Sequence, residues 1–356
     1  MRRRLLAITM TGGLTLVMAP AASALATWTV VPSPNPASGD TLLLGADAIS
    51  TTNVWAVGRS DGGTAPFRRT LTMRWNGSAW SVVPSPTPVD GGQLNDVDGT
   101  SATDVWAVGT HVQRWNGSAW NVVPSPSGFF GGVKTLSPAQ AWAVGSSGGN
   151  TLTARWNGSA WSQVPSPSRP GTFNVLQAVD GASANDLWAV GHSIVDPGYG
   201  VEEALILRWN GSAWSIVPAP DRFAGLKGVV ALAANDVWAV GERFSQQAVR
   251  FVPYAIHWNG TSWSRVEVPD PGVTAGSELN AVTALSPAKV YAVGQSGARP
   301  FITRWDGTRW TIEPTPSVTG PTLFGATSTG TGTVWGVGHR FTDIALRTLT
   351  VRTTNG

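Results

Sequence analysis

The sequence feature that most constrains the fold is a tryptophan-marked repeat that occurs seven times along 356 residues. One column of the repeat reads W-A-V-G or a close variant, and its aromatic residues are Trp55, Trp106, Trp142, Trp188, Trp238, Tyr291 and Trp335. A second column reads W-N-G or W-D-G, at Trp75, Trp115, Trp156, Trp209, Trp258 and Trp305. A third column lies three residues beyond each Asn-Gly or Asp-Gly, at Trp80, Trp120, Trp161, Trp214, Trp263 and Trp310, and it also includes Trp28 near the N-terminus. All 19 tryptophans fall in these columns, which predicts a repeated core between structural units.

Each copy of the repeat predicts four β-strands. An apolar residue stands twelve positions before each W-A-V-G aromatic, and a small residue follows it two positions later in all copies but the one with Asp96, as expected of crowded inner strands. The W-A-V-G run suits a strand buried on both faces. Asn-Gly predicts a tight type I′ turn between the third and fourth strands, and Pro-Ser-Pro ends the fourth. Four strands per copy of about 47 residues predict an all-β, seven-bladed β-propeller with four antiparallel strands per blade.

The two ends of the chain share one copy. The segment from Trp28 to Pro34 repeats the one from Trp80 to Pro86, but no W-N-G precedes it. The seventh copy in turn stops at Asn355-Gly356. We therefore expect the N- and C-terminal strands to pair in the last blade, with Asn355-Gly356 next to Thr27-Trp28, and to close a ring over residues 27–356.

These repeats resemble the tryptophan-rich W-A-V-G/W-N-G repeat proteins secreted by actinobacteria, and more distantly the kelch and galactose-oxidase β-propellers. The resemblance covers residues 27–356 and implies the fold, while propellers serve many functions. Galactose-oxidase chemistry needs a copper site with a Cys–Tyr crosslink, and the sequence has no cysteine.

The first 26 residues have the pattern of a secretory signal peptide. Three arginines precede an apolar stretch, and Ala24-Leu25-Ala26 is a small-x-small cleavage site. Export through the Sec route is favoured, with the twin-arginine route as the alternative, and we expect a secreted, extracellular protein without a membrane span after cleavage. Removing the leader leaves equal numbers of basic and acidic residues, so nucleic acid is not an expected partner.

Four charged residues share one position of the predicted inner strands: Asp47, Asp98, Lys134 and Asp180. Paired carboxylates near a propeller axis could serve glycoside hydrolysis, but solvated channel lining is the simpler interpretation. Asp96-Val97-Asp98-Gly99 is only a fragment of a calcium loop. The histidines His111, His192, His257 and His339 do not cluster in the sequence, and the five N-G-S/T sequons coincide with the predicted turns. We therefore expect no metal, no cofactor and no enzymatic activity.

The variable connections indicate where a ligand would bind. The connections after the second and fourth strands differ between copies, and strand alternation places both on one face. The longest lie in the fourth and fifth copies, around 196–203 and 242–252, and the candidate ligand-binding residues there are Asp196, Tyr199, Glu202, Glu203, Glu242, Arg243 and Phe244. We expect a monomeric binding module for an extracellular or cell-surface glycan or protein. The alternatives are a polysaccharide-acting hydrolase or lyase, a structural envelope protein, and a lectin with repeated sites at its tryptophans.

Overall fold

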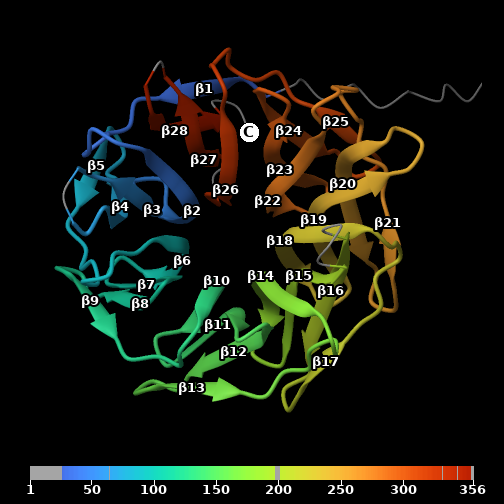
Figure 1. Cartoon of the computed structure of the whole chain (residues 1–356), viewed down its shortest axis with the longest axis horizontal. Coiled ribbons are helices and arrows are strands. Elements are labelled where there is room, and N and C mark those ends of the chain that lie inside the picture. Colours follow the sequence, from blue (N-terminus) through green and yellow to red (C-terminus); the bar gives the residue numbers. More distant parts are fainter. Residues whose placement is uncertain (1–25, 64, 197–200, 331, 343, 354–356) are drawn as a thin grey trace, which may run out of the picture.

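The computed structural model describes residues 26–63, 65–196, 201–330, 332–342 and 344–353. Within these ranges the chain forms seven antiparallel sheets of four strands, arranged as blades around a central axis (Figure 1). The inner strands, next to the axis, are β2 (Thr41–Ser50), β6 (Leu94–Ser101), β10 (Phe129–Ser137), β14 (Phe173–Ser183), β18 (Ala224–Ala233), β22 (Ser277–Ser286) and β26 (Thr322–Ser328). The second strands, which carry W-A-V-G, are β3 (Asn53–Asp61), β7 (Asp104–Gly109), β11 (Gln140–Ser147), β15 (Asp186–Asp196), β19 (Asp236–Ser245), β23 (Lys289–Ser296) and β27 (Val334–Phe341).

The third and outer strands complete each blade. The third strands are β4 (Arg68–Trp75), β8 (Val112–Trp115), β12 (Asn150–Trp156), β16 (Val201–Trp209), β20 (Arg250–Trp258), β24 (Arg299–Trp305) and β28 (Leu346–Thr353). The outer strands are β5 (Trp80–Val83), β9 (Trp120–Val123), β13 (Trp161–Val164), β17 (Trp214–Ile216), β21 (Trp263–Arg265), β25 (Trp310–Ile312) and β1 (Trp28–Val31). We number the blades from β2–β5 (blade 1) to β26–β28 with β1 (blade 7).

The prediction that the chain ends pair in one blade is confirmed. β1 pairs with β28 in the antiparallel register Trp28↔Thr353 to Val31↔Thr350. Figure 1 shows β1 beside β28 in the last blade of the ring. The predicted Asn355-Gly356 junction lies outside the described residues.

The tryptophan columns meet between blades, as predicted. Trp55 of blade 1 lies 5.0 Å from Trp115 and 5.1 Å from Trp120 of blade 2, measured between ring centroids. Equivalent triads follow at Trp106, Trp142, Trp188, Trp238 and Trp335. Every tryptophan is buried except the half-buried Trp305. Because each hydrophobic cluster spans two neighbouring blades, the core is a ring of seven interfaces.

Two columns of small residues allow the close approach of strands near the axis. A Cβ on Gly45 would lie 2.7 Å from the main-chain oxygen of Asn95 in the next blade. A Cβ on Gly58, the glycine of W-A-V-G, would lie 2.1 Å from the main-chain oxygen of Leu42 in its own blade. The first column sets the spacing between blades, and the second accommodates a register shift between Leu43 and Gly45.

The prediction of a type I′ turn at Asn-Gly is wrong. Trp75 pairs with Trp80, so the connection has four residues, and of its residues only Gly77 has a positive φ, of 100°. Asn76 acts through its side chain: its Oδ1 accepts hydrogen bonds from Ser78 N, Ser78 Oγ and Ala79 N, each at 2.9 Å. The serine or threonine that follows Asn-Gly is therefore part of the turn, which accounts for the sequon pattern structurally.

The long connections of the fourth and fifth copies are extended hairpins rather than loops. β15 and β16 continue to the pair Asp196↔Val201, and β19 and β20 continue to Ser245↔Arg250. None of the described residues forms a helix that could cross a membrane.

Candidate binding face and channel

The two ends of the propeller differ in their connections. The short turns from first to second strand and from third to fourth strand lie at one end, which we call the turn face. The variable connections, from second to third strand and from blade to blade, lie at the other end, which we call the loop face. This division follows from the antiparallel order of each sheet, and it places the two hairpin extensions on the loop face.

In the blade 4 hairpin, the predicted ligand residues contact other parts of the protein. The carboxylate of Glu203 lies 2.5 Å from Arg169 Nη1 and 3.1 Å from Arg222 Nε, so it joins the connections on both sides of its blade. Glu202 Oε1 lies 3.7 Å from His192 Nε2. Tyr199 lies outside the described residues. Asp196 ends β15, where it pairs with Val201.

In the blade 5 hairpin, the three predicted residues are separated. Glu242 contacts the inner strand of its own blade, where its Oε1 lies 3.1 Å from Lys227 Nζ. Arg243 lies on the other face of the strand and lines a cavity of about 160 Å³ with Tyr254 and Arg265. Phe244 packs edge-to-face on Phe251, its cross-strand partner, with ring centroids 5.6 Å apart. The six predicted residues that the structure describes therefore do not all converge on one site.

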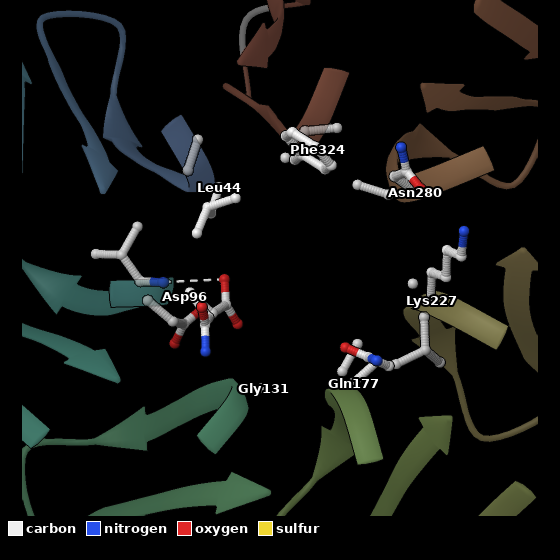
Figure 2. Close-up of a pocket in the computed structure, with 18 of the residues that line it drawn as sticks. Leu44, Asp96, Gly131, Gln177, Lys227, Asn280 and Phe324 are labelled. Carbon is white, nitrogen blue, oxygen red and sulfur yellow. Dashed lines mark hydrogen bonds between the residues drawn. The ribbon is translucent and has the colours of Figure 1, made fainter. Parts of the chain in front are cut away.

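A channel of about 600 Å³ runs along the axis, lined by all seven inner strands. Figure 2 labels seven of its lining residues, one from each inner strand: Leu44, Asp96, Gly131, Gln177, Lys227, Asn280 and Phe324. The lining is polar but uneven. Aspartates dominate blades 1, 2 and 4, whereas Lys227 and Glu278 mark blades 5 and 6.

The aspartates of the column that sequence analysis assigned to the channel link blades 1, 2 and 4 to the blade that follows each of them. Asp47 Oδ2 accepts a hydrogen bond from Gly99 N at 3.0 Å, and Asp180 Oδ2 accepts one from Ala231 N at 2.8 Å. In blade 7 a threonine does the same, because Thr327 Oγ1 accepts from Ala48 N at 3.0 Å. The column thus supplies hydrogen-bond acceptors to main-chain donors that face the channel. This role depends on contacts between blades and could not be inferred from the repeat alone.

Lys134 takes the place of an aspartate in blade 3. Its Nζ lies 3.0 Å from Asp180 Oδ1 and 3.5 Å from Asp98 Oδ1, so it bridges the blades on either side. These two carboxylates raise the pKa of Lys134 above its usual range. One cation therefore balances part of the negative charge of this wall.

Two aspartates of this wall, Asp47 and Asp96, have raised pKa values. Burial raises the pKa of Asp47 well above the usual value, and the neighbouring Asp98 carboxylate raises it further. Burial also raises the pKa of Asp96 to about 7, against the hydrogen bonds that Asp96 accepts from Val133 N and Val97 N. Asp96 therefore titrates near neutral pH, and burial favours the protonated form of Asp47 as well.

A second charged group surrounds Lys227 at the loop-face mouth of the channel. Lys227 Nζ lies 2.6 Å from Glu278 Oε2 as well as 3.1 Å from Glu242 Oε1. Burial raises the pKa of Glu242 to about 7, whereas the Lys227 ammonium overcomes the effect of burial at Glu278 and lowers the pKa of that carboxyl.

The four histidines lie in four blades and have separate contacts. His257 replaces the arginine before the third-strand tryptophan, where it bonds Asp236 at 2.8 Å and stacks on Trp238. Arg114 does the same in blade 2, with Asp104 and Trp106. Among the residues in the described ranges, no three or more His, Asp or Glu side chains are arranged to hold a metal ion.

Sequence analysis missed the apolar side chains of the loop face. Thirteen large apolar side chains are exposed in the described part of the chain. Eight of them lie on the loop face: Phe67, Val89, Phe129, Phe173, Val249, Phe251, Phe341 and Ile344. The other five lie on outer strands: Val30, Val82, Val122, Ile216 and Ile312. The available signal was that the loop-face residues begin or follow strands at the variable connections, outside the repeat's own columns.

No protein-family model matches the sequence, and no curated protein matches it. Solved structures do match. A structure of YCF48 bound to D1 peptide covers 92% of this chain and 97% of its own, with a TM-score of 0.61 and 13% identity. YCF48 from Cyanidioschyzon merolae covers 93% and 98%, with a TM-score of 0.60 and 15% identity. A chain in a crystal structure of a mitotic checkpoint complex covers 100% of both chains, with a TM-score of 0.61 and 12% identity. At these identities the similarity shows the β-propeller fold alone.

Proposed function

We propose that this chain is a secreted, non-enzymatic binding module that recognises a protein partner through the loop face. The observation that carries the proposal is the distribution of exposed apolar side chains, most of which lie on that face. Exposed apolar groups gathered on one side of a rigid scaffold are typical of protein-interaction surfaces.

The charged residues of the loop face support the same conclusion. Glu203 is paired with Arg169 and Arg222, and Arg68 lies 3.8 Å from Asp61. A partner would gain little from these groups, since each pair must be broken before either member can bind elsewhere. Phe67 and Ile344, in contrast, expose 67% and 85% of their surface, and a partner could bury them.

Glycan recognition through repeated tryptophans is less favoured, because the tryptophan rings are buried between blades. A glycan bound by the hairpins of blades 4 and 5 remains the alternative. Among the similar structures, the YCF48 complex contains a bound peptide, and the checkpoint propeller belongs to a protein complex. Those partners belong to those proteins, and they support a protein ligand here only as a precedent for the fold.

The test uses a displayed random-peptide library and a glycan array, both probed with the exported chain. We expect enriched peptides with apolar residues and no specific glycan. The loop-face variant is Phe67→Ser/Phe341→Ser/Ile344→Ser, which should weaken peptide binding at least tenfold. The matched control is Val82→Ser/Val122→Ser/Ile312→Ser, which removes exposed apolar residues from the outer strands and should leave binding unchanged.

A third variant, Val249→Ser/Phe251→Ser, tests the blade 5 hairpin that sequence analysis favoured. Equal loss in the outer-strand control would contradict the loop-face proposal. Specific glycan binding that survives all three variants would transfer the function to another surface and another ligand class. Release of reducing sugars from a polysaccharide panel would establish the hydrolytic alternative.

A further inference from the structure

The strongest departure from the repeat is a buried acid in blade 6. In the other six copies the third residue after the outer-strand tryptophan is a valine: Val31, Val83, Val123, Val164, Val217 and Val266. In blade 6 it is Glu313. The valines of this column are half-buried, but Glu313 is only 2% exposed. A charged group at such a position requires partners, since an unpaired buried carboxylate is strongly unfavourable.

The partners of Glu313 come from its own blade and from the start of the described chain. Arg304 Nε lies 2.9 Å from Glu313 Oε1. The main-chain N–H of Ala26 donates a hydrogen bond of 2.8 Å to Glu313 Oε2. This bond joins positions 287 residues apart and is buried. The only acidic residue of this column, Glu313, therefore lies in blade 6, which the N-terminal segment contacts through Ala26.

Ala26 is itself part of the core. It is 3% exposed and belongs to the same apolar cluster as Trp28 and Tyr291. This cluster is the blade 6–blade 7 interface, where Trp28 packs at 6.0 Å against Tyr291 without a second tryptophan. Ala26 thus contributes both a methyl group and an N–H donor at the interface with the fewest tryptophans.

Cleavage after Ala26 would remove both contributions. Glu313 would lose its main-chain donor, and the cluster would lose a buried methyl group. A buried acceptor without its donor and a small void each lower stability. The sequence contains a second small-x-small triplet two residues upstream, Ala22-Ser23-Ala24, which would leave Ala26 in place.

We infer that Ala26 belongs to the mature chain and that the leader is removed after Ala24. This inference rests on the export proposed above. In the reaction, a signal peptidase hydrolyses the Ala24–Leu25 peptide bond with one water molecule. Ala24 gains a carboxylate and Leu25 becomes the N-terminal ammonium. The carboxylate of Glu313 then accepts the N–H of an internal peptide group, one residue inside the new terminus.

The test is N-terminal sequencing and intact-mass measurement of the full chain expressed in an exporting bacterium. We expect the secreted protein to begin at Leu25. A secreted protein that begins at Thr27 overturns the inference and leaves export intact. A protein that retains Met1 inside the cell contradicts both the inference and the proposed export.

Two leader variants separate the triplets. Ala22→Leu places a large residue in the upstream triplet and leaves Ala24-Leu25-Ala26 unchanged, so it should abolish cleavage at Leu25. Thr11→Leu changes the apolar stretch outside both triplets and is the control, which should be processed as the natural chain is. If the natural chain and Ala22→Leu both begin at Thr27, the upstream site is not used.

A coupling measurement tests the contact itself. Replacing Ala26 by proline, which has no main-chain N–H, should lower the melting temperature of the exported chain, and the loss should be smaller in a Glu313→Val background, where no carboxylate needs the donor. Equal losses in the two backgrounds would show that the Ala26–Glu313 bond does not hold the segment.

Discussion

The carboxylate of Asp98 in blade 2 accepts a hydrogen bond of 2.6 Å from the main-chain N–H of Thr135 in blade 3. Thr135 Oγ1 in turn donates to the main-chain oxygen of Asp98 at 3.1 Å. These two bonds join neighbouring inner strands that belong to different sheets. A side chain of the channel wall thereby acts as a connector between blades.

Asp98→Ala should therefore destabilise the fold. The change leaves Thr135 N without its acceptor and removes one of the two carboxylates beside Lys134, so we expect a loss of about 1–3 kcal/mol in the free energy of unfolding. Urea denaturation measures it. Asp90→Ala, at an exposed residue of the connection between blades 1 and 2, is the control and should change stability by less than about 0.5 kcal/mol. Equal stability of the two variants would show that the bond to Thr135 contributes nothing.

The protonation of Asp96 should make the stability of the fold depend on pH. Its folded pKa of about 7 lies above the ordinary aspartate pKa of 3.8, so the folded state binds the proton more tightly than the unfolded state. Its contribution to stability is complete below about pH 4 and is lost as the pH rises through 7. We expect Asp96→Asn, which keeps an acceptor oxygen, to be more stable relative to the natural chain at pH 8 than at pH 5. Denaturation curves at both pH values decide this, and a difference that is independent of pH would contradict the assignment.

Trp142→Ala tests the tryptophan triads. Its ring is fully buried and lies 4.8 Å from Trp209 and 5.4 Å from Trp214. Replacing a buried aromatic residue by alanine typically costs about 3–5 kcal/mol, because the cavity does not fully collapse. We expect a loss of this size by urea denaturation, against a near-neutral Val122→Ala on an outer strand. If the Trp142→Ala variant is as stable as the natural chain but no longer binds peptide, Trp142 is a recognition residue instead.

Sequence reasoning recovered the features that each repeat shows by itself. The spacing of twelve residues between Leu43 and Trp55 recurs in every copy, and it fixed the inner and second strands. The shared blade followed from the missing W-N-G before Trp28. In each case the evidence is a residue type that recurs, or is missing, at a fixed position of the repeat.

The features that sequence reasoning missed depend on partners outside the repeat. The role of Asp98 is set by the main chain of Thr135 in another sheet, and a single copy does not reveal it. The hairpin from Phe244 to Phe251 was interpreted as a loop because no W-A-V-G or W-N-G column marks it, although cross-strand pairing of the two phenylalanines extends the sheet. The buried Glu313 accepts a main-chain hydrogen bond from Ala26, which lies 287 residues away in the sequence.

The Asn-Gly turns allow a prediction that separates side-chain from main-chain effects. Asn157 Oδ1 accepts hydrogen bonds from Ser159 N, Ser159 Oγ and Ala160 N, and Asp306 does the same for Thr308 and Arg309 in blade 6. Asn157→Asp should therefore leave stability nearly unchanged, whereas Asn157→Ala should cost about 1–2 kcal/mol. Thermal denaturation of both variants at pH 7 distinguishes them. If the two are equally destabilised, the turn requires a property of asparagine other than its acceptor oxygen.

Closure of the ring provides the final prediction. β1 supplies the outer strand of blade 7, and the segment after it continues the contact, since Thr348 Oγ1 donates to the main-chain oxygen of Pro34 at 3.0 Å. Deleting residues 27–34 would remove Trp28 from its interface and expose the edge of β28 along Thr350 and Arg352. Exposed strand edges pair with other chains, so we expect the melting temperature to fall by many degrees and the variant to self-associate. Differential scanning calorimetry and light scattering measure the two effects.

A control deletion of residues 62–63, in the connection between β3 and β4, should keep a monomer with nearly natural stability. A monomeric deletion variant with an unchanged melting temperature would show that the ring is held closed without the N-terminal strand.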